Sequence, residues 1–322
     1  MEGSFQPAAT LIDDEAALAT RAAWFYYAGG LTQSEVADRL GVAPVKAHRL
    51  IARATKAGFV RVFVDGPIGG CIGLEDALMA RFGLSTCRVV PDVDAPDPPL
   101  RGLGRAAASI LREALERGEH RVIGLGHGRT LAAALEVLPQ VPAPDVRFVS
   151  LLGAVPRRIK TGPFDVITRA AEKTGAEAFL LPVPMIADTA ADADVLRRQR
   201  GVAETLALAA QATLVFAGIG AIAEAAYLPM AGMLNPAELQ ALREAGAAGE
   251  MLGRYFGADG APVRTDLDER VIAIHPRALR GVVAVAGGAD KTTAIQAVLT
   301  SGMLTGLITD EPTARRLVAM TS

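Results

Sequence analysis

At 322 residues the chain is too long for one small module and fits two domains. Hydrophobic residues make up 51% of it and aromatic residues 5%, which excludes a disordered chain and suits helices packed on a buried sheet. The formal net charge of −2 excludes a general attraction to nucleic acid or membrane, so any basic surface must be local.

The sequence shows no pattern typical of a signal peptide, a membrane span or a disulfide bond. The first residues lack the basic start and apolar core of a signal peptide. The uncharged stretch from Thr205 to Ala223 contains a glutamine and two glycines, so we interpret it as helix, strand and glycine loop rather than a membrane span. Cys71 and Cys87 have no CxxC spacing and are predicted to be buried, reduced thiols. A cytoplasmic protein is predicted.

The first 65 or so residues have the pattern of three helices. Asp13 begins the first, with acids in its first turn and glycines after its end. The segment Thr32–Glu35 matches a capping box, in which threonine caps a helix and the glutamate three residues on reaches back. Gly41 permits the left-handed conformation of a sharp turn, and Pro44 suits the first turn of a helix predicted to end near Ala57.

This last helix is predicted to carry a basic stripe. At roughly 100° per residue, its lysines and arginines fall within an arc of about 80°, beside an apolar face of alanine, leucine and isoleucine. A capped helix, a tight turn and a basic helix form the helix-turn-helix arrangement that binds DNA. Gly58–Val64 alternates as a short strand, predicted to be a wing. The alternative is an ordinary solvated helix face.

Residues near the start of the basic helix are expected to reach base edges, and the other polar residues are expected to meet phosphates. The candidate DNA-binding residues are Thr32, Gln33, Ser34, Pro44, Val45, Lys46, His48, Arg49, Arg53, Lys56 and Arg61.

The glycine- and proline-containing segment 66–70 marks a domain boundary, so we predict a helix-turn-helix domain at residues 1–66 and a larger α/β domain at 67–322. A connecting helix is expected from Leu74 to Phe82. Eight apolar runs then alternate with helical segments, which predicts a mostly parallel sheet buried on both faces. These runs are CRVV, RVIGLG, RFVSLLGA, AFLLPVP, TLVFAGIG, RVIAI, VVAVAGG and GLIT.

Three of the predicted strands end in glycine loops. They lead into Gly126–Thr130, into Gly218 and Gly220, and into the segment before Lys291. Ligands of open α/β sheets bind beyond the carboxyl ends of the strands, where backbone N–H groups at a helix start can hold an anion. The loops therefore predict a phosphate or polyol site, although a tight turn also needs glycine for structural reasons alone.

Sharper catalytic motifs are absent from the sequence. GLGHGR is not GxGxxG, GGADKT is not a Walker loop, and no HExxH, GxSxG or paired cysteine ligands occur. His127 could be a base, but no carboxylate is tied to it by spacing. No catalytic residue, metal or cofactor is predicted.

Eight segments between about Ala19 and Leu317 carry a family resemblance, namely AWFYYAGGLTQSEVADRLGV, RLIARATKAGFVRV, LGHGRTL, LLGAV, GIG, AGEMLGRYF, VAGGADKTTAI and LITDEPTARRL. In these segments and in their order the chain resembles the SorC/DeoR-type sugar-responsive regulators of bacteria. One departure is Ala43-Pro44, where the family usually opens the recognition helix with Ser-Arg.

The resemblance implies a DNA-binding domain joined to a sensor domain similar to sugar-phosphate isomerases and deaminases. It also implies a homotetramer and a sugar, sugar phosphate or polyol effector. The effector-binding residues predicted from the loops and the resemblance together are Gly126, His127, Gly128, Arg129, Thr130, Gly153, Gly218, Gly220, Glu250 and Lys291.

We therefore predict a transcriptional regulator of a carbohydrate or polyol catabolic operon that binds palindromic operator DNA. The alternatives are a sugar-phosphate isomerase or deaminase with an accessory helix-turn-helix domain, and a protein-interaction module.

Overall fold

The computed structural model describes residues 14–60, 69–92, 99–154 and 166–320, and it divides into two units, Met1–Val64 and Asp65–Ser322. Each unit is described by itself. Within the described ranges, no helix is both long enough and apolar enough to cross a membrane.

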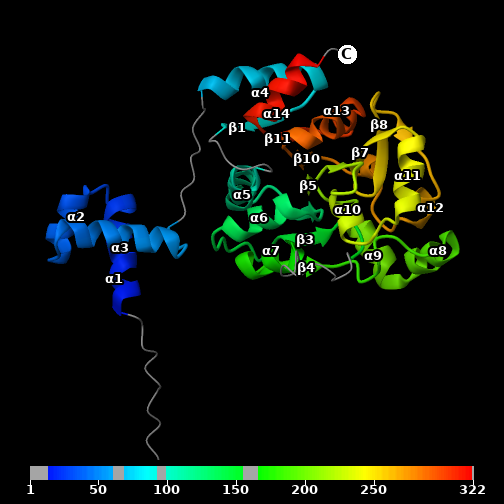
Figure 1. Ribbon diagram of the computed structural model, residues 1–322. Coiled ribbons are helices and arrows are strands. Elements are labelled where there is room, and N and C mark those ends of the chain that lie inside the picture. The colour runs from blue at the N-terminus through cyan, green and yellow to red at the C-terminus, as the bar shows by residue number, and fades with distance from the viewer. Residues whose placement is uncertain (1–13, 61–68, 93–98, 155–165, 321–322) are drawn as a thin grey trace, which may run out of the picture. The chain divides into compact units, whose positions relative to one another are not determined.

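The amino-terminal unit consists of helices α1 (Asp14–Ala23), α2 (Gln33–Leu40) and α3 (Pro44–Lys56), with a π-helical turn η1 (Trp24–Ala28) after α1 (Figure 1). Its core is built mainly from alanines, together with Val36, Leu50 and Ile51, and all three of these larger side chains are buried. The small alanine side chains let the three helices approach closely, so a short segment can still form a core.

The connection between α2 and α3 has the predicted geometry. The Thr32 hydroxyl accepts a hydrogen bond from the Glu35 N–H (3.3 Å), and the Glu35 carboxylate accepts one from the Thr32 N–H (2.7 Å), so the capping box is confirmed. Gly41 is left-handed at φ 63°, and Pro44 is the first residue of α3. The predicted wing is not seen as a strand: residues 58–60 form a turn and coil, and residues 61–64 lie outside the described residues.

The larger unit contains a seven-stranded sheet in which every pair of neighbouring strands is parallel, as predicted. The order is β1-β11-β10-β5-β2-β3-β4. The strands are β1 (Thr86–Val90), β2 (Val122–Leu125), β3 (Arg147–Ser150), β4 (Glu177–Phe179), β5 (Leu214–Ala217), β10 (Val282–Val285) and β11 (Gly306–Asp310). Every residue of β2, β5, β10 and β11 is buried, which explains their continuous apolar runs.

One predicted strand was wrong. The run RVIAI at residues 270–274 forms only isolated bridges, Leu152 to Ala273 and Ile186 to Val271, and joins neither sheet. Its apolar character has another origin, because Ile272 is fully buried in a satellite cluster with Leu181 and Val202.

Helices cover both faces of the parallel sheet (Figure 1). The connections through α5 (Leu100–Arg117), α6 (Arg129–Val137) and α7 (Val166–Thr174) advance toward β4, whereas those through α9 (Arg200–Ala209) and α13 (Thr292–Thr300) return toward β1. Right-handed crossovers in opposite directions place helices on opposite faces. Helix α4 (Gly69–Phe82), which begins earlier than the predicted connecting helix, packs with α14 (Glu311–Ala319) beside β1. Cys71 and Cys87 are buried and free.

A second, antiparallel sheet was not predicted. It has the order β6-β7-β8-β9, formed by Gly220–Ala221, Ala247–Met251, Arg254–Gly257 and Pro262–Val263. Shorter elements surround it, namely α8 (Ala190–Arg198), α10 (Tyr227–Met230), α11 (Pro236–Glu244), α12 (Leu267–Arg270) and the 3-10 turns η2 (Pro276–Ala278) and η3 (Ala289–Lys291). Helix α13 packs on β7 and so joins the two sheets.

Candidate functional site

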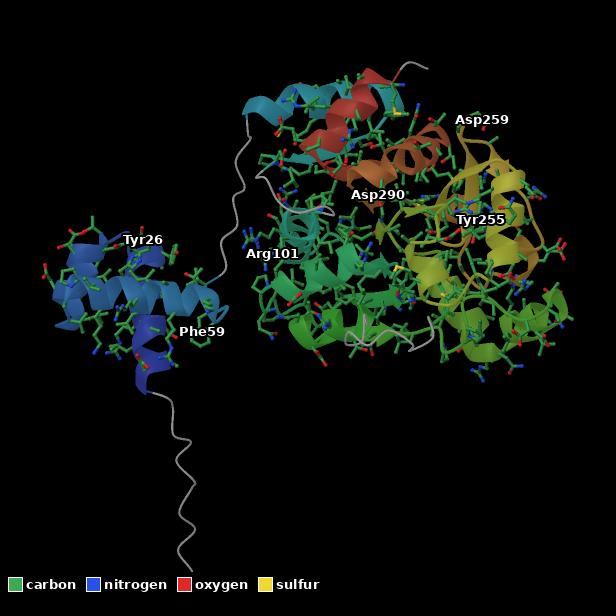
Figure 2. The ribbon with its side chains drawn as sticks, viewed as in Figure 1. Tyr26, Phe59, Arg101, Tyr255, Asp259 and Asp290 are labelled. Atoms are coloured by element: carbon green, nitrogen blue, oxygen red, sulfur yellow. The ribbon has the colours of Figure 1, made fainter. Side chains whose placement is uncertain are left out.

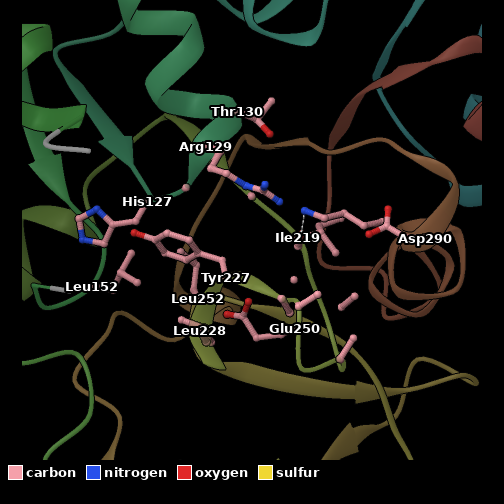
Figure 3. Close-up of a pocket in the computed structure, with 18 of the residues that line it drawn as sticks. His127, Arg129, Thr130, Leu152, Ile219, Tyr227, Leu228, Glu250, Leu252 and Asp290 are labelled. Atoms are coloured by element: carbon pink, nitrogen blue, oxygen red, sulfur yellow. Dashed lines mark hydrogen bonds between the residues drawn. The ribbon is translucent and has the colours of Figure 1, made fainter. Parts of the chain in front are cut away.

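A cavity of about 90 Å³ opens at the carboxyl ends of β2, β5 and β10 (Figure 3). Between β2 and β5 the chain changes direction across the sheet, and this switch point is where ligands of doubly wound sheets bind. The lining residues are Leu100, His127, Gly128, Arg129, Thr130, Leu152, Met185, Gly218, Ile219, Gly220, Ala221, Ala223, Ala225, Ala226, Tyr227, Leu228, Glu250, Leu252, Asp290 and Lys291.

Eight of the ten predicted effector residues line this cavity. They are His127, Gly128, Arg129, Thr130, Gly218, Gly220, Glu250 and Lys291. Parallel strands bring their carboxyl ends to one edge, so loops distant in sequence meet there. The other two predicted residues, Gly126 and Gly153, do not line the cavity.

Both of these glycines contribute through backbone contacts next to the cavity. The N–H of Gly126 donates to the Phe216 carbonyl oxygen (2.8 Å), which ties the end of β2 to β5. A β-carbon on Gly153 would lie 2.6 Å from the Pro184 carbonyl oxygen, so the backbone there is too close for any side chain. The Gly153 carbonyl instead accepts a hydrogen bond from Nε2 of His127 (3.2 Å).

The loop after β2 presents the start of a helix to the cavity. Gly128 caps α6 at φ 127°, a conformation that an L side chain rarely adopts, and Arg129 is the first residue of the helix. The first-turn N–H groups of a helix have no partners within it and favour negative charge. The exposed side chain of Arg129 adds a positive charge at the start of α6. This wall of the cavity can therefore hold an anion or a group with several hydrogen-bond acceptors.

Glu250 supplies a buried acidic group to the cavity. Its side chain lies on β7 opposite Gly220, is 9% exposed, and accepts a hydrogen bond from the Gly253 N–H at 2.7 Å. Burial raises the pKa of this carboxyl to about 7, while the Gly253 hydrogen bond and the charge of Lys291 act in the opposite direction. A carboxylate in this position can accept hydrogen bonds from ligand hydroxyl groups.

Lys291 enters from the loop after β10. Its ammonium group donates a hydrogen bond to the Ile219 carbonyl oxygen at 3.0 Å, which holds the side chain beside the loop that follows β5. The preceding glycine loop is fixed from below, because the Gly288 N–H donates to the buried carboxylate of Asp310 (2.9 Å) and to the Thr313 hydroxyl (3.0 Å). A well-anchored loop therefore carries Lys291, so little conformational entropy is lost when the lysine binds a ligand.

Tyr227 is a cavity residue that sequence reasoning missed. Figure 3 shows its hydroxyl pointing toward the His127 ring, and burial raises its pKa. It comes from the short helix α10 in an irregular segment, where no motif marked it. The same is true of Leu228. His127 and Tyr227 therefore place two polar side chains together in the wall of the cavity.

The second candidate surface is the predicted basic face of α3. Val45, Lys46, His48, Arg49 and Lys56 are all exposed, and Val45 is 65% exposed despite being apolar. The residues predicted at the start of α2 (Thr32, Gln33, Ser34) and Pro44 are exposed as well. The opposite face of α3 is buried against α1 and α2. An exposed apolar residue flanked by cations suits the edge of a base pair.

Arg53 has a different environment from the other basic residues. It is half-buried and forms an ion pair with Glu15 of α1 (side chains 41% and 62% exposed). Its charge is therefore partly neutralised within the protein. Arg61, also predicted to contact DNA, lies outside the described residues.

Comparisons with known proteins agree with this arrangement. The family model described as "Putative sugar-binding domain" matches residues 66–319. The erythritol catabolism regulatory protein EryD of Brucella abortus is 47% identical over 310 residues, which cover 96% of this chain and 98% of that protein. The transcriptional regulator LsrR of Klebsiella pneumoniae is 32% identical over 315 residues, covering 96% of this chain and 94% of that one.

The solved structure of the full-length sorbitol operon regulator SorC from Klebsiella pneumoniae has the same fold, with a TM-score of 0.75 at 23% identity. The matched region covers 94% of this chain and 98% of the SorC chain.

Proposed function

Because this chain belongs to the SorC-type family of sugar-binding transcriptional regulators, we propose that a small polyol or sugar, free or phosphorylated, binds the cavity at the switch point and controls operator binding through α3. The observation that carries the proposal is the meeting of Glu250, Arg129 and Lys291 in one cavity at the sheet edge. A carboxylate recognises hydroxyl groups, and two cations recognise a phosphate or electron-rich oxygens.

The relatives favour a small polyol. One relative at 47% identity is named for erythritol catabolism, and a structural neighbour is named for the sorbitol operon. We propose an erythritol-like effector, with the Glu250 carboxylate accepting from its hydroxyl groups and Lys291 placed to meet a phosphate if one is present.

For the amino-terminal unit, we propose that α2 and α3 act as a DNA-binding helix-turn-helix, with residues 1–66 as the DNA-binding domain and 67–322 as the sensor. The exposed residues of α3 would enter the major groove, and Thr32, Gln33 and Ser34 would contact phosphates at the start of α2. We propose a homotetramer on a palindromic operator in the cytoplasm, since symmetric assemblies match symmetric half-sites.

An effector can switch such a protein only if it binds two arrangements of the subunits unequally. We propose that this sensing involves no turnover. The relatives are named as regulators, and in this cavity the Glu250 carboxylate is held by a backbone hydrogen bond rather than by a catalytic partner.

The test is a thermal-shift panel of erythritol, sorbitol and their phosphates, followed by operator binding with each stabilising compound. An effector at ~100 times its dissociation constant should raise the free energy of unfolding by about 2.7 kcal/mol. Lys291→Met should remove most of the gain for phosphorylated compounds, whereas Lys173→Met in α7, outside the cavity, should not. If no polyol or sugar shifts the wild-type protein, or if one is consumed, the proposal is wrong.

A further inference from the structure

A second cavity, of about 270 Å³, lies at the small antiparallel sheet and shares no described lining residue with the first. The β7–β8 hairpin contributes to both: Glu250 and Leu252 line the first cavity, and Arg254 and Tyr255 line the second. Tyr255 lies in the small sheet (Figure 2). The remaining polar lining comes from Arg264, Asp268, His275 and Arg277.

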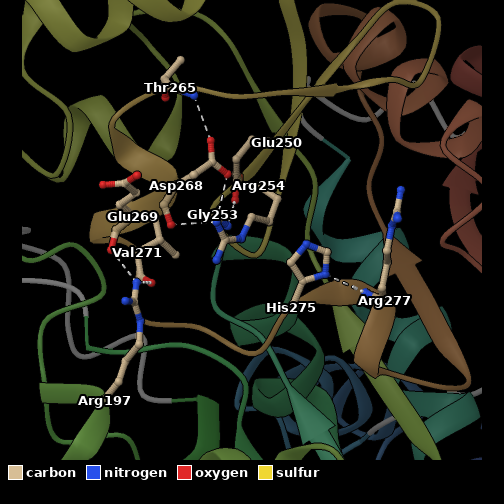
Figure 4. Close-up of polar contacts among 10 residues, drawn as sticks. All are labelled: Arg197, Glu250, Gly253, Arg254, Thr265, Asp268, Glu269, Val271, His275 and Arg277. Carbon is tan, nitrogen blue, oxygen red and sulfur yellow. Dashed lines mark hydrogen bonds and ion pairs between the residues drawn. The ribbon is translucent and has the colours of Figure 1, made fainter. Parts of the chain in front are cut away.

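The charge of this cavity is strongly one-sided. Among the described residues that line it there are three arginines and one carboxylate, that of Asp268. This carboxylate is already engaged: Oδ1 accepts from Arg254 at 2.9 Å, and Oδ2 accepts from the Thr265 N–H at 2.9 Å (Figure 4). Arg264 and Arg277 therefore leave the lining residues of this cavity with a net positive charge.

Buried donors at this site lack partners within the described parts of the chain. Nε of Arg254 and the hydroxyl of Tyr255 are both buried without a hydrogen bond, and the Tyr255 side chain is only 1% exposed. The neighbouring hydroxyl of Thr265 is in the same condition. Leaving a buried polar group unsatisfied costs about 1–3 kcal/mol, so a further group that reached these atoms would relieve that cost.

His275 adds another donor. Figure 4 shows its ring between the side chains of Arg254 and Arg277. Burial and the charges of these two arginines lower its pKa, so the ring is neutral near pH 7. Nδ1 accepts a hydrogen bond from the Arg277 N–H at 3.2 Å, which places the ring proton on Nε2. The guanidinium groups of Arg254, Arg264 and Arg277 and this histidine tautomer are all N–H donors among the lining residues.

We propose that this second cavity binds a small oxyanion of the phosphate class. Several donors around a positive cavity match a ligand with several acceptor oxygens, and guanidinium groups bind phosphate in paired hydrogen bonds. A polyol is a poorer match, because each hydroxyl would also need an acceptor and the Asp268 carboxylate is already engaged. The proposal does not depend on the first cavity binding an effector.

The experiment is titration calorimetry of the full-length protein with inorganic phosphate at constant ionic strength. The Lys291→Met background removes a phosphate site in the first cavity, so heat in this background reports the second. Arg277→Gln should weaken phosphate binding about tenfold, the loss expected for one charge-assisted hydrogen bond. Arg280→Gln makes the same charge change three residues away, at an exposed arginine that does not line the cavity, and should change it less than about twofold.

Equal effects of the Arg277 and Arg280 variants would overturn the proposal, as would loss of all phosphate heat in Lys291→Met alone. Light scattering provides the third arm. If Arg277→Gln changes the oligomeric state while phosphate affinity stays constant, the donors serve a second copy of the chain and the proposal is wrong. Because Arg277 is exposed, the variant is expected to fold, and its circular dichroism spectrum should match the wild type.

Discussion

A β-carbon added to Gly220 would lie 2.5 Å from Oε2 of Glu250, because the two residues face each other across the β6–β7 pair. The carboxylate would have to move, which would disturb the hydrogen bond that its other oxygen accepts from Gly253, and the same β-carbon would lie 3.4 Å from Cβ of Glu250. The absence of a side chain at residue 220 therefore leaves room for the one acidic side chain that is buried in the cavity.

Gly220→Ala is expected to displace the Glu250 carboxylate and weaken effector binding about tenfold or more, the loss of one strong hydrogen bond. The change should be measured as a dissociation constant by calorimetry. Gly201→Ala in α9 is the matched control, because a β-carbon there meets no atom within 4 Å. Unchanged effector affinity in Gly220→Ala would show that Glu250 does not contact the ligand.

The ionisation of Glu250 should make stability depend on pH. Its pKa is raised to about 7 in the folded protein, whereas a glutamate in an unfolded chain ionises near pH ~4.3. Between these values the folded state binds more protons than the unfolded state, so the free energy of unfolding should fall as pH rises from about 4.5 to about 7 and then level off. Glu250→Gln remains neutral throughout and should lack this part of the decline.

Urea unfolding of both proteins at pH 5, 6, 7 and 8 gives the difference directly, because the other titrating groups are common to both. The difference should change by a few kcal/mol across the window, at about 1.4 kcal/mol per pKa unit. Parallel curves for wild type and Glu250→Gln would show that the carboxyl titrates at its ordinary value.

The parallel sheet could be predicted because a strand buried on both faces is apolar at most of its positions. VIGL, LVFA and VVAV are such strands, and all their residues are buried. The same signal failed at RVIAI, since burial of Ile272 in a side cluster produces the same letters without strand pairing. An apolar run predicts that a segment is buried, but it does not predict whether that segment pairs with a strand.

The small sheet escaped prediction for a different reason. Its strand AAGEM consists of residues with low strand propensity, and the hairpin turn is Leu252-Gly253 instead of the usual Asn-Gly or Asp-Gly. Sequence patterns did locate most of the cavity, because glycine loops at strand ends are local features that parallel topology brings together. Tyr227 reaches the cavity from the short helix α10, and no local sequence pattern marks that placement.

The exposed cations of α3 should determine the salt dependence of operator binding. Log affinity should fall with log salt, and Lys56→Ala should make the slope shallower by about 0.9, the loss of one phosphate contact. Arg21→Ala, an exposed arginine in the last turn of α1, is the control for charge alone. Equal changes from the two variants would remove the special role of the α3 face.

Glu15→Gln should strengthen operator binding. In the wild type the carboxylate of Glu15 pairs with Arg53, and an exposed ion pair of this kind is worth at most about 1 kcal/mol, so breaking it costs little stability. Removing the negative charge of Glu15 beside Arg53 makes this site more attractive to a phosphate, which should steepen the salt slope by up to about 0.9. Glu204→Gln breaks the comparable pair with Arg200 in α9 and should leave operator affinity unchanged. A weaker complex for Glu15→Gln would mean that the ion pair orients Arg53 for binding.

Leu252 is a site where backbone strain and packing compete. It is the one described residue other than glycine with a positive φ (53°), and its side chain is 4% exposed and lines the first cavity. Leu252→Gly would relieve about 1–2 kcal/mol of left-handed backbone strain but remove a buried side chain worth about 2–5 kcal/mol. The variant should therefore be less stable by about 1–3 kcal/mol in urea unfolding and should bind effector more weakly. A more stable variant would show that the strain exceeds the packing, in which case the leucine is retained for its contact with the ligand.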